Sequence, residues 1–314
     1  ACVMKERGLK ARYLFADTGN EHELTLQHVD YLADALDIEI ETVRADFTAR
    51  FAERRANLYK FWSRPGRAND KGQRAPIVPD HLIARAIELL QPTGIPFLDL
   101  CMLKGRFPSA KARFCTEELK LIPMDAIKVP ILNGGESVVD WIGERAQESK
   151  NREKKPRLET IDWRFNTDSG KALLHPGKRI LYRPIHGLTH EEVFAISKRH
   201  GLKPNPLYLM GMGRVGCMPC IMAKKGELRE IAKRFPEHID RIEEWEAIVS
   251  EVSRRMSATF FPAVMVPGEG ERRAHVRAAV EWAKTGRGGW NYTFDPLFED
   301  GDLEMCVSAY GLCE

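Results

Sequence analysis

The sequence predicts an α/β fold with a doubly wound parallel sheet, followed by a mainly helical C-terminal part. Residues 13–16 form a short apolar run that closes on Asp17, Thr18 and Gly19, which is typical of a buried strand ending in a turn. Residues 24–36 place apolar side chains at helical spacing, and residues 38–43 alternate like a strand. Strand, helix and strand within about 30 residues form a βαβ unit, which implies a parallel sheet covered by helices.

Length and composition set the broad class. A chain of 314 residues accommodates one large α/β domain with a smaller C-terminal part, and 43% hydrophobic with 30% charged residues is typical of a globular protein. We see no apolar stretch near the roughly 18 residues of a membrane span and no secretory leader, so we expect a cytoplasmic protein that does not enter a membrane. The net charge of +3 gives no global case for a nucleic-acid binder, although basic residues can still cluster locally.

Further elements follow from local patterns. Residues 129–132 and 138–142 are predicted strands, and residues 144–179 form a long polar connection. Thr189 and Glu192 make a T-x-x-E capping box that opens a helix ending near Gly201. Other helices are expected at residues 80–90, in two short pieces within 97–122, at 224–256 with a break at Pro236, and at 274–285.

The turn after the first strand is a candidate ligand site. Residues 15–21 read Phe-Ala-Asp-Thr-Gly-Asn-Glu and follow a parallel strand at its carboxyl end, where open α/β sheets bind ligands. Gly19 allows close approach of the backbone to a ligand, and the next helix offers its N-terminus to an anion. An ordinary strand-to-helix turn, with Asp17 and Asn20 as turn residues, explains the same pattern.

Basic residues mark a second candidate. Residues 144–157 contain six basic and three acidic side chains, and the planar guanidinium groups of Arg145 and Arg152 suit phosphate or sulfate. Arg183, before Pro184, could present its guanidinium to the same kind of ligand. A solvated charged loop and a strand that leads into a helix are the plainer interpretations.

The cysteines give the strongest local signal. Seven are scattered along the chain, an odd number that argues against a secreted disulfide framework. Cys217 and Cys220 form a C-x-x-C pair in a glycine-rich loop, which suits zinc, an iron–sulfur cluster or a redox dithiol. Cys115 is a candidate third ligand, and Cys306, Cys313 or an exogenous group could supply the fourth.

Five segments in order resemble the PAPS reductase family between about residues 11 and 235. They are FADTGNEH, RFCTEELK around Cys115, GERAQES, YRPI around Arg183, and NPLYLMGMGRVGCMPC around Cys217 and Cys220. Each segment alone is a weak or moderate signal, and five in the same order are hard to obtain by chance. The nearest similarity is to phage and bacterial PAPS-reductase-like proteins and to the ATP pyrophosphatase of DNA phosphorothioation.

The resemblance implies a fold, a ligand and a cofactor. The fold would be of the adenine nucleotide α-hydrolase type, with a nucleotide-binding domain at residues 1–222 and a helical and irregular region at 223–314. The ligand would be ATP or an adenylyl sulfate, with Mg²⁺ as a possible companion, and the cluster, most simply 4Fe–4S, would be held by Cys115, Cys217 and Cys220. Contacts to the nucleotide would come from Asp17, Thr18, Gly19, Glu21, Arg145, Glu148, Ser149, Arg152 and Arg183.

The resemblance leaves the reaction open. A reductase would use a thiolate such as Cys313 to attack an adenylyl sulfate, whereas an ATP pyrophosphatase would activate a nucleic-acid oxygen for sulfur insertion, with residues 224–290 as a partner surface. The C-terminal E-C-G-L-H tail of assimilatory reductases is absent, which favours the second chemistry slightly. The S-G-G-x-D-S phosphate loop of the family is also absent, and we expect it to precede Ala1.

One further partner and one rival function follow from the same residues. A sulfur-donor protein is a possible partner of either reaction, while the oligomeric state is not predicted. The rival is a non-catalytic nucleotide- or nucleic-acid-binding protein that keeps the fold and holds a structural zinc ion at the cysteines.

Overall fold

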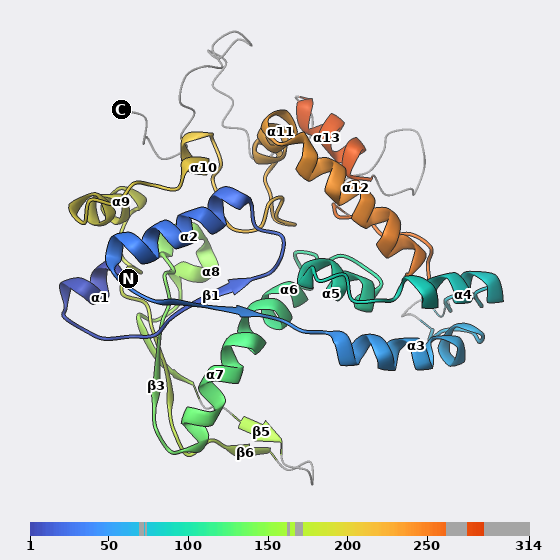
Figure 1. The fold of residues 1–314 in the computed structure, drawn as a ribbon, viewed down its shortest axis with the longest axis horizontal. Helices are drawn as coiled ribbons and strands as arrows, with labels where there is room; N and C mark the ends of the chain where they lie inside the picture. Colours follow the sequence, from blue (N-terminus) through green and yellow to red (C-terminus); the bar gives the residue numbers. More distant parts are fainter. Residues whose placement is uncertain (69–71, 73, 162–163, 167–171, 262–274, 286–314) are drawn as a thin grey trace. The chain divides into compact units, whose positions relative to one another are not determined.

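A computed structural model describes residues 1–68, 72, 74–161, 164–166, 172–261 and 275–285 (Figure 1). The chain forms two compact units, and neither is continuous in sequence. Unit 1 comprises residues 1–16, 27–43 and 121–206, and unit 2 comprises residues 17–26, 44–120 and 207–314. No helix in the described part of the chain has both the length and the apolar character needed to cross a membrane.

The described strands form three small sheets. In unit 1 the order is β3 (Val138–Trp141), β7 (Arg179–Tyr182) and β4 (Leu158–Ile161), with β3 parallel and β4 antiparallel to β7. Two-stranded sheets are formed by β1 (Tyr13–Asp17) with β2 (Ile40–Arg44), and by β5 (Arg164–Asn166) with the antiparallel β6 (Ala172–Leu174). Strands and helices thus make a mixed α/β architecture, while the doubly wound sheet stays a prediction.

The helices are numbered in chain order. Those wholly or mainly in unit 1 are α1 (Cys2–Glu6), α2 (Glu23–Leu36), α7 (Ile122–Asn133), the 3₁₀ turn η2 (Ala146–Glu148), α8 (Lys150–Glu153) and α9 (His190–Arg199). The others are α3 (Thr48–Trp62), α4 (Asp80–Leu89), α5 (Pro96–Lys104), α6 (Phe114–Thr116), the π-helical turn η1 (Glu117–Leu121), α10 (Pro206–Leu209), α11 (Lys225–Arg234), α12 (Pro236–Glu251) and α13 (Val276–Lys284).

Several predicted elements are confirmed by their end signals. Thr189 accepts a hydrogen bond from the backbone N–H of Glu192, whose side chain accepts one from the Thr189 N–H, so the capping box starts α9 as expected. Pro236 stands at the first position of α12 and separates this helix from α11. Both outcomes follow from local hydrogen bonding, which the sequence encodes directly.

Three predictions made from apolar patterns need correction. Residues 129–132 belong to helix α7 and not to a strand, because an apolar run of four residues fits either structure and tertiary packing decides. The polar connection at 144–179 contains η2, α8, β4, β5 and β6. Helix α3 was not anticipated, since its mainly polar sequence gives a weak apolar stripe around Phe51, Leu58 and Trp62.

Helix α5 lies at the centre of the unit 2 core. It begins with Pro96, and all residues from Pro96 to Leu103 are buried, which is typical of a helix surrounded by protein. The Phe97 ring lies 5.8 Å from that of Trp245 and 5.9 Å from that of Phe260. The Phe97 N–H donates to the Thr18 carbonyl at 2.9 Å, so this core fixes the turn that follows β1.

Candidate functional site

The turn after β1 is organised around the Glu21 carboxylate. Glu21 is buried and accepts hydrogen bonds from the Thr18 N–H at 3.0 Å and from the Thr18 hydroxyl at 2.7 Å. The Asn20 N–H approaches the same carboxylate at 3.3 Å, and Asp17 accepts from the Gly19 N–H at 2.8 Å. The predicted ligand turn therefore has a fixed shape, set by its own acidic side chains.

Gly19 is required by this shape. Its φ is +73°, in the left-handed region that favours glycine. A Cβ atom at this position would lie 2.9 Å from Pro96 Cδ and 3.1 Å from Ile95 Cγ2, so the turn packs closely against the start of α5. Both the backbone conformation and the lack of space exclude a larger residue.

The C-x-x-C loop is bound to this same turn. Glu21 and Cys217 form an antiparallel β-bridge, and the Met218 N–H donates to the Asn20 carbonyl at 2.7 Å. The Asn20 side-chain amide donates to the Pro219 carbonyl at 3.1 Å. Two segments almost 200 residues apart in sequence thus form one structural element, which we call the turn–thiol element: residues 17–21 with residues 217–220.

The Cys217 thiol faces polar groups of the turn. Its Sγ lies 3.6 Å from Glu21 Oε1, to which it donates, and 3.5 Å from the Thr18 hydroxyl. Burial raises the pKa of Cys217 to about 12, and the Glu21 charge acts in the same direction while Lys120 opposes it. The Cys217 thiol must lose its proton before its sulfur can bind a metal as a thiolate. Metal binding at this position would therefore release one proton.

The third predicted cysteine lies within electrostatic range of the pair. Burial raises the pKa of Cys115, and the Cys220 thiolate adds to the effect, whereas Lys120 lowers it. The same Cys220 charge raises the pKa of Cys217. In addition, Cys220 Sγ accepts the Met222 N–H at 3.4 Å. Cys115, Cys217 and Cys220 all belong to unit 2, and the Lys120 charge lowers the pKa of both Cys115 and Cys217.

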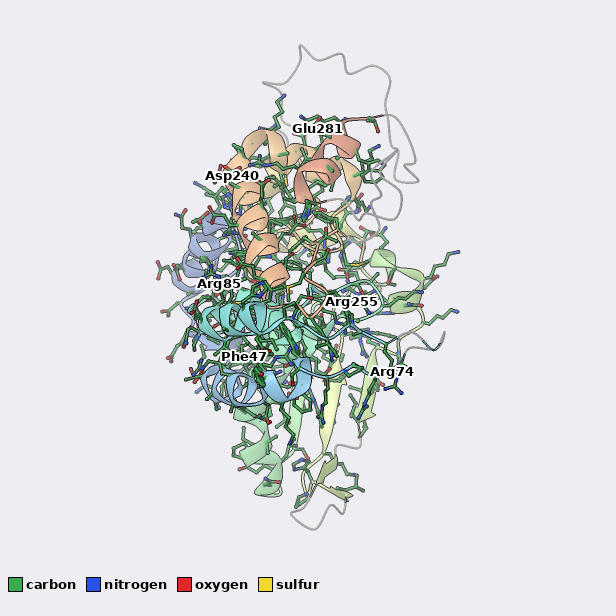
Figure 2. The ribbon with its side chains drawn as sticks, turned by 90° about the vertical axis from the view of Figure 1, so that its right-hand side faces the viewer. Phe47, Arg74, Arg85, Asp240, Arg255 and Glu281 are labelled. Atoms are coloured by element: carbon green, nitrogen blue, oxygen red, sulfur yellow. The ribbon has the colours of Figure 1, made fainter. Side chains whose placement is uncertain are left out.

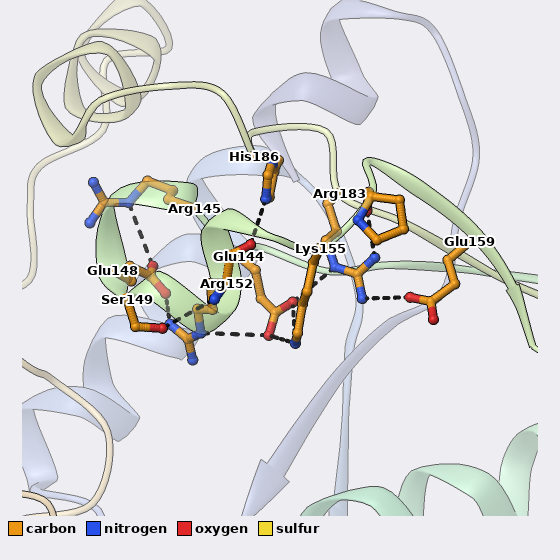
Figure 3. A network of polar contacts seen from close by, with 10 residues as sticks. Glu144, Arg145, Glu148, Ser149, Arg152, Lys155, Glu159, Arg183 and His186 are labelled. Atoms are coloured by element: carbon orange, nitrogen blue, oxygen red, sulfur yellow. Dashed lines mark hydrogen bonds and ion pairs between the residues drawn. The ribbon is translucent and has the colours of Figure 1, made fainter.

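Unit 1 carries the second predicted group, shown in Figure 3. Arg145 lies 3.6 Å from Glu148, which also pairs with Arg152, and Arg152 lies 3.6 Å from Glu144. Lys155 donates to Glu144 at 2.8 Å. The Ser149 hydroxyl caps α8 by accepting the Arg152 N–H at 3.2 Å. The predicted anion-binding side chains are thus already held in place by neighbouring carboxylates.

Arg183 has a different setting from the one expected for a ligand contact. The residue is 2% exposed, and its guanidinium donates to Glu144 at 2.9 Å, to Glu159 at 3.1 Å and to the Pro156 carbonyl at 2.8 Å (Figure 3). These three acceptors fix the ends of the 144–157 segment against β4 and β7. In this position Arg183 orders the segment that carries Arg145 and Arg152.

A histidine pair lies beside the turn–thiol element. His22, Glu23 and His238 are the one set of described Cys, His, Asp and Glu side chains whose three ligand atoms all lie within 4.8 Å of one another. However, His22 Nδ1 accepts the Leu24 N–H at 3.0 Å, and the two imidazole rings stack at 14° with centroids 4.9 Å apart. Nitrogen lone pairs in nearly parallel planes do not converge on one ion, so His22 acts here as the N-cap of α2.

Residues that the sequence did not single out complete the element. Arg241 on α12 donates to Asn20 Oδ1 at 3.0 Å and to the Met218 carbonyl at 2.8 Å. Burial lowers the pKa of Arg241, and Glu23, Glu21 and Cys217 oppose that effect. Arg241 lies in an ordinary amphipathic helix, so no local signal could have identified it. Of the predicted residues, Cys306 and Cys313 lie outside the described part of the chain.

Comparison with known families agrees with this geometry. The model of the phosphoadenosine phosphosulfate reductase domain matches residues 2–223, which contain the turn–thiol element, Cys115 and the unit 1 cluster. The chain belongs to the phosphoadenosine phosphosulfate reductase family. This confirms the resemblance found in the sequence, and the membership implies an α/β fold of the nucleotide α-hydrolase type.

Relatives of this PAPS reductase family member occur in phages and in an archaeon. A 37.8 kDa protein in the gpa 5′ region of Escherichia phage 186 is 45% identical over 96% of this chain and 88% of its own length. The nin-region protein ORF290 of Escherichia phage lambda is 27% identical over 49% of this chain and 45% of the relative. A protein of Methanocaldococcus jannaschii is 25% identical over 81% of this chain and 39% of the relative.

Proposed function

We propose that the protein is an enzyme that uses an adenine nucleotide, ATP or an adenylyl sulfate, for sulfur transfer or reduction with the help of a cysteine-bound iron–sulfur cluster. The observation that carries the proposal is the turn–thiol element, because it joins the predicted nucleotide turn directly to the C-x-x-C pair. Family membership supports the adenine-nucleotide and sulfur chemistry at the coarser level. The doubly wound sheet is part of this proposal, and the parallel β3–β7 pair agrees with it.

The three thiols suit a cluster more than a single zinc ion. Cys115, Cys217 and Cys220 influence one another electrostatically, yet they are not among the described side chains that converge within the 4.8 Å spacing of a single ion. Thiolates on a cluster are spread more widely, because each binds a different iron atom. When bound, the cluster would tune or relay the sulfur chemistry, and Lys120 would offset part of its negative charge.

Each residue of the turn has a separate role in the proposal. Asp17 and Thr18 contact the nucleotide, Gly19 supplies the backbone conformation that the turn needs, and Glu21 keeps the turn in shape. In unit 1 Arg145, Glu148, Ser149 and Arg152 remain the proposed contacts for anionic groups. That cluster contains four cations and three carboxylates, so one positive charge remains to attract an anion. The cations are Arg145, Arg152, Lys155 and Arg183, and the carboxylates are Glu144, Glu148 and Glu159.

The reaction is tested by supplying both nucleotides to the protein expressed from its complete gene. We expect turnover of one of them, seen as pyrophosphate released from ATP or, with an added dithiol that supplies the two electrons, as sulfite released from an adenylyl sulfate. Glu21→Gln should lower that turnover at least tenfold, because one carboxylate oxygen becomes an amide that cannot accept the Thr18 hydrogen bonds. The matched control is Glu23→Gln, at an exposed position two residues further on, which should keep more than half of the rate.

Two results would count against this function. Binding of neither nucleotide by the iron-loaded protein would remove the nucleotide from the proposal and favour a non-catalytic protein with a structural metal. Equal losses in the Glu21 and Glu23 variants would remove the special role of the buried carboxylate.

A further inference from the structure

A strongly basic surface covers α3 and the hairpin that follows it in unit 2. Residues 48–78 contain eight arginine and lysine residues and two acidic residues, a local net charge of +6, whereas the whole chain carries +3. The rest of the protein is therefore acidic on balance, and the positive charge is concentrated in about a tenth of the sequence. Such a local concentration is the electrostatic footprint of a polyanion site.

The spacing along α3 places these side chains in one row. Positions 50, 54, 57 and 61 follow one another at intervals of four and three residues, which puts them on one side of α3. The row holds Arg50, Arg54 and Phe61 and is about 16 Å long. Arg64 follows two residues after the helix ends at Trp62. Arg64 lies over the exposed Phe61 ring, with its guanidinium carbon 5.4 Å from the ring centroid.

Backbone contacts join the two arms of the hairpin that follows α3. The Gly66 N–H donates to the Ala75 carbonyl at 2.9 Å, and Ala68 and Arg74 form an antiparallel β-bridge. From outside the hairpin, Arg254 donates to the Pro76 carbonyl at 3.1 Å and also to the Arg64 carbonyl. Arg67 and Arg74 are exposed, and Arg74 is labelled in Figure 2.

Of the cations along α3 and its hairpin, Arg50 is neutralised by Glu118, whereas several others have no such partner in the described part of the chain. Among the residues that the structure describes, Lys60, Arg64, Arg67 and Arg74 form no ion pair. Burial lowers the pKa of Arg54, and no carboxylate acts against that effect. The basic side chains near α13 differ, because Arg277 pairs with Asp240 and Glu243 and Lys284 pairs with Glu281. Of the two surfaces, the one on α3 and its hairpin carries more described cations without an acidic partner.

Exposed rings are interleaved with these cations. Phe61 is 48% exposed and Tyr59 is 49% exposed, and the Tyr59 hydroxyl donates to Asp80 at 3.2 Å. Unpaired bases stack on such rings while arginine and lysine follow the phosphates, the combination used by proteins that bind single strands. A duplex hides its base faces and could use only the cations.

We propose that α3 and its hairpin bind single-stranded nucleic acid, through Arg54, Lys60, Arg64, Arg67 and Arg74 to the phosphates and through Phe61 to a base. The site is separate from the turn–thiol element and does not rest on the sulfur chemistry. A variant that loses the thiols, such as Cys217→Ser, should bind the strand as the wild type does. Failure of the proposed enzyme function therefore leaves this proposal standing, and the reverse also holds.

The experiment is a fluorescence anisotropy titration with a labelled single-stranded oligonucleotide of mixed sequence at several salt concentrations. The triple variant Arg64→Gln, Arg67→Gln, Arg74→Gln should lose at least tenfold in affinity, and the slope of log K against log salt should decrease by about 2, since each phosphate contact contributes roughly 0.7. Phe61→Ala should lose at least fivefold with an unchanged slope, because stacking releases no counterions.

The matched control removes the same number of charges elsewhere. Arg229→Gln, Arg277→Gln, Lys284→Gln changes the α11–α13 surface and should leave the affinity within about twofold, with thermal unfolding confirming that both triple variants are folded. The proposal is overturned if the wild type does not bind the oligonucleotide, if both triple variants lose affinity equally, or if phosphatidylserine vesicles bind to α3 in preference to the strand.

Discussion

Replacing either cysteine of the C-x-x-C pair by serine is expected to abolish the proposed iron–sulfur cluster. Cys217→Ser and Cys220→Ser should each reduce bound iron and the absorbance near about 400 nm to less than roughly a tenth of the wild-type values. Serine is close to cysteine in size, and at position 217 it can keep the hydrogen bond toward Glu21. A hydroxyl is, however, a poor ligand for iron. Iron, acid-labile sulfide and absorbance are measured after anaerobic purification.

The control for this loss is a cysteine outside unit 2. Cys2→Ser changes a partly exposed cysteine on α1 and should leave iron and absorbance unchanged. Cys115→Ser should behave like the C-x-x-C variants, since its thiol interacts electrostatically with Cys220. Full iron content in Cys115→Ser, with loss in the other two, would show that position 115 is not a ligand.

The largest loss of stability is expected at Glu246 in α12. This carboxylate is 1% exposed and accepts hydrogen bonds from the Phe260 N–H at 2.7 Å, the Val276 N–H at 2.8 Å and the Thr259 hydroxyl at 3.0 Å. Both oxygens accept a backbone N–H, so either orientation of a glutamine would bring its NH₂ group against a donor. Glu246→Gln should lower the free energy of unfolding by about 2–4 kcal/mol, measured by urea denaturation.

An exposed glutamate of the same helix is the matched control. Glu243→Gln removes a carboxylate that is half exposed and pairs with Arg277 at 2.9 Å, so the unfolding free energy should change by less than about 0.5 kcal/mol. Similar changes in the two variants would mean that Glu246 does not join α12 to the start of α13 and to the segment around Phe260.

The predicted ligand turn and the C-x-x-C pair lie in one structural element. Sequence reasoning found each half because glycine, acidic turn residues and a C-x-x-C pair have local chemical meanings. Their connection through Asn20 and Met218 depends on segments that meet only after folding, so no local pattern contains it. The same holds for Arg241, which reaches Asn20 from a helix that looks ordinary in the sequence.

Arg183 illustrates the opposite case. Its sequence context allowed a ligand contact, but its guanidinium donates to three acceptors within the protein. The burial of a single arginine side chain cannot be predicted from the residues next to it in the sequence. The short apolar run at 129–132 was ambiguous for a similar reason, since the helix or strand choice depended on the packing of α7. Elements with capping residues and prolines, such as α9 and α12, were predictable because their signals lie within a few residues.

The central claim is that Cys115, Cys217 and Cys220 hold an iron–sulfur cluster next to the proposed nucleotide turn. It is tested most directly by the metal content of the wild-type protein, purified without oxygen and analysed for iron, sulfide and zinc. The account predicts about four iron and four sulfide per chain with a broad absorbance near about 400 nm. One zinc per chain, with neither iron nor sulfide after attempted reconstitution, would contradict it.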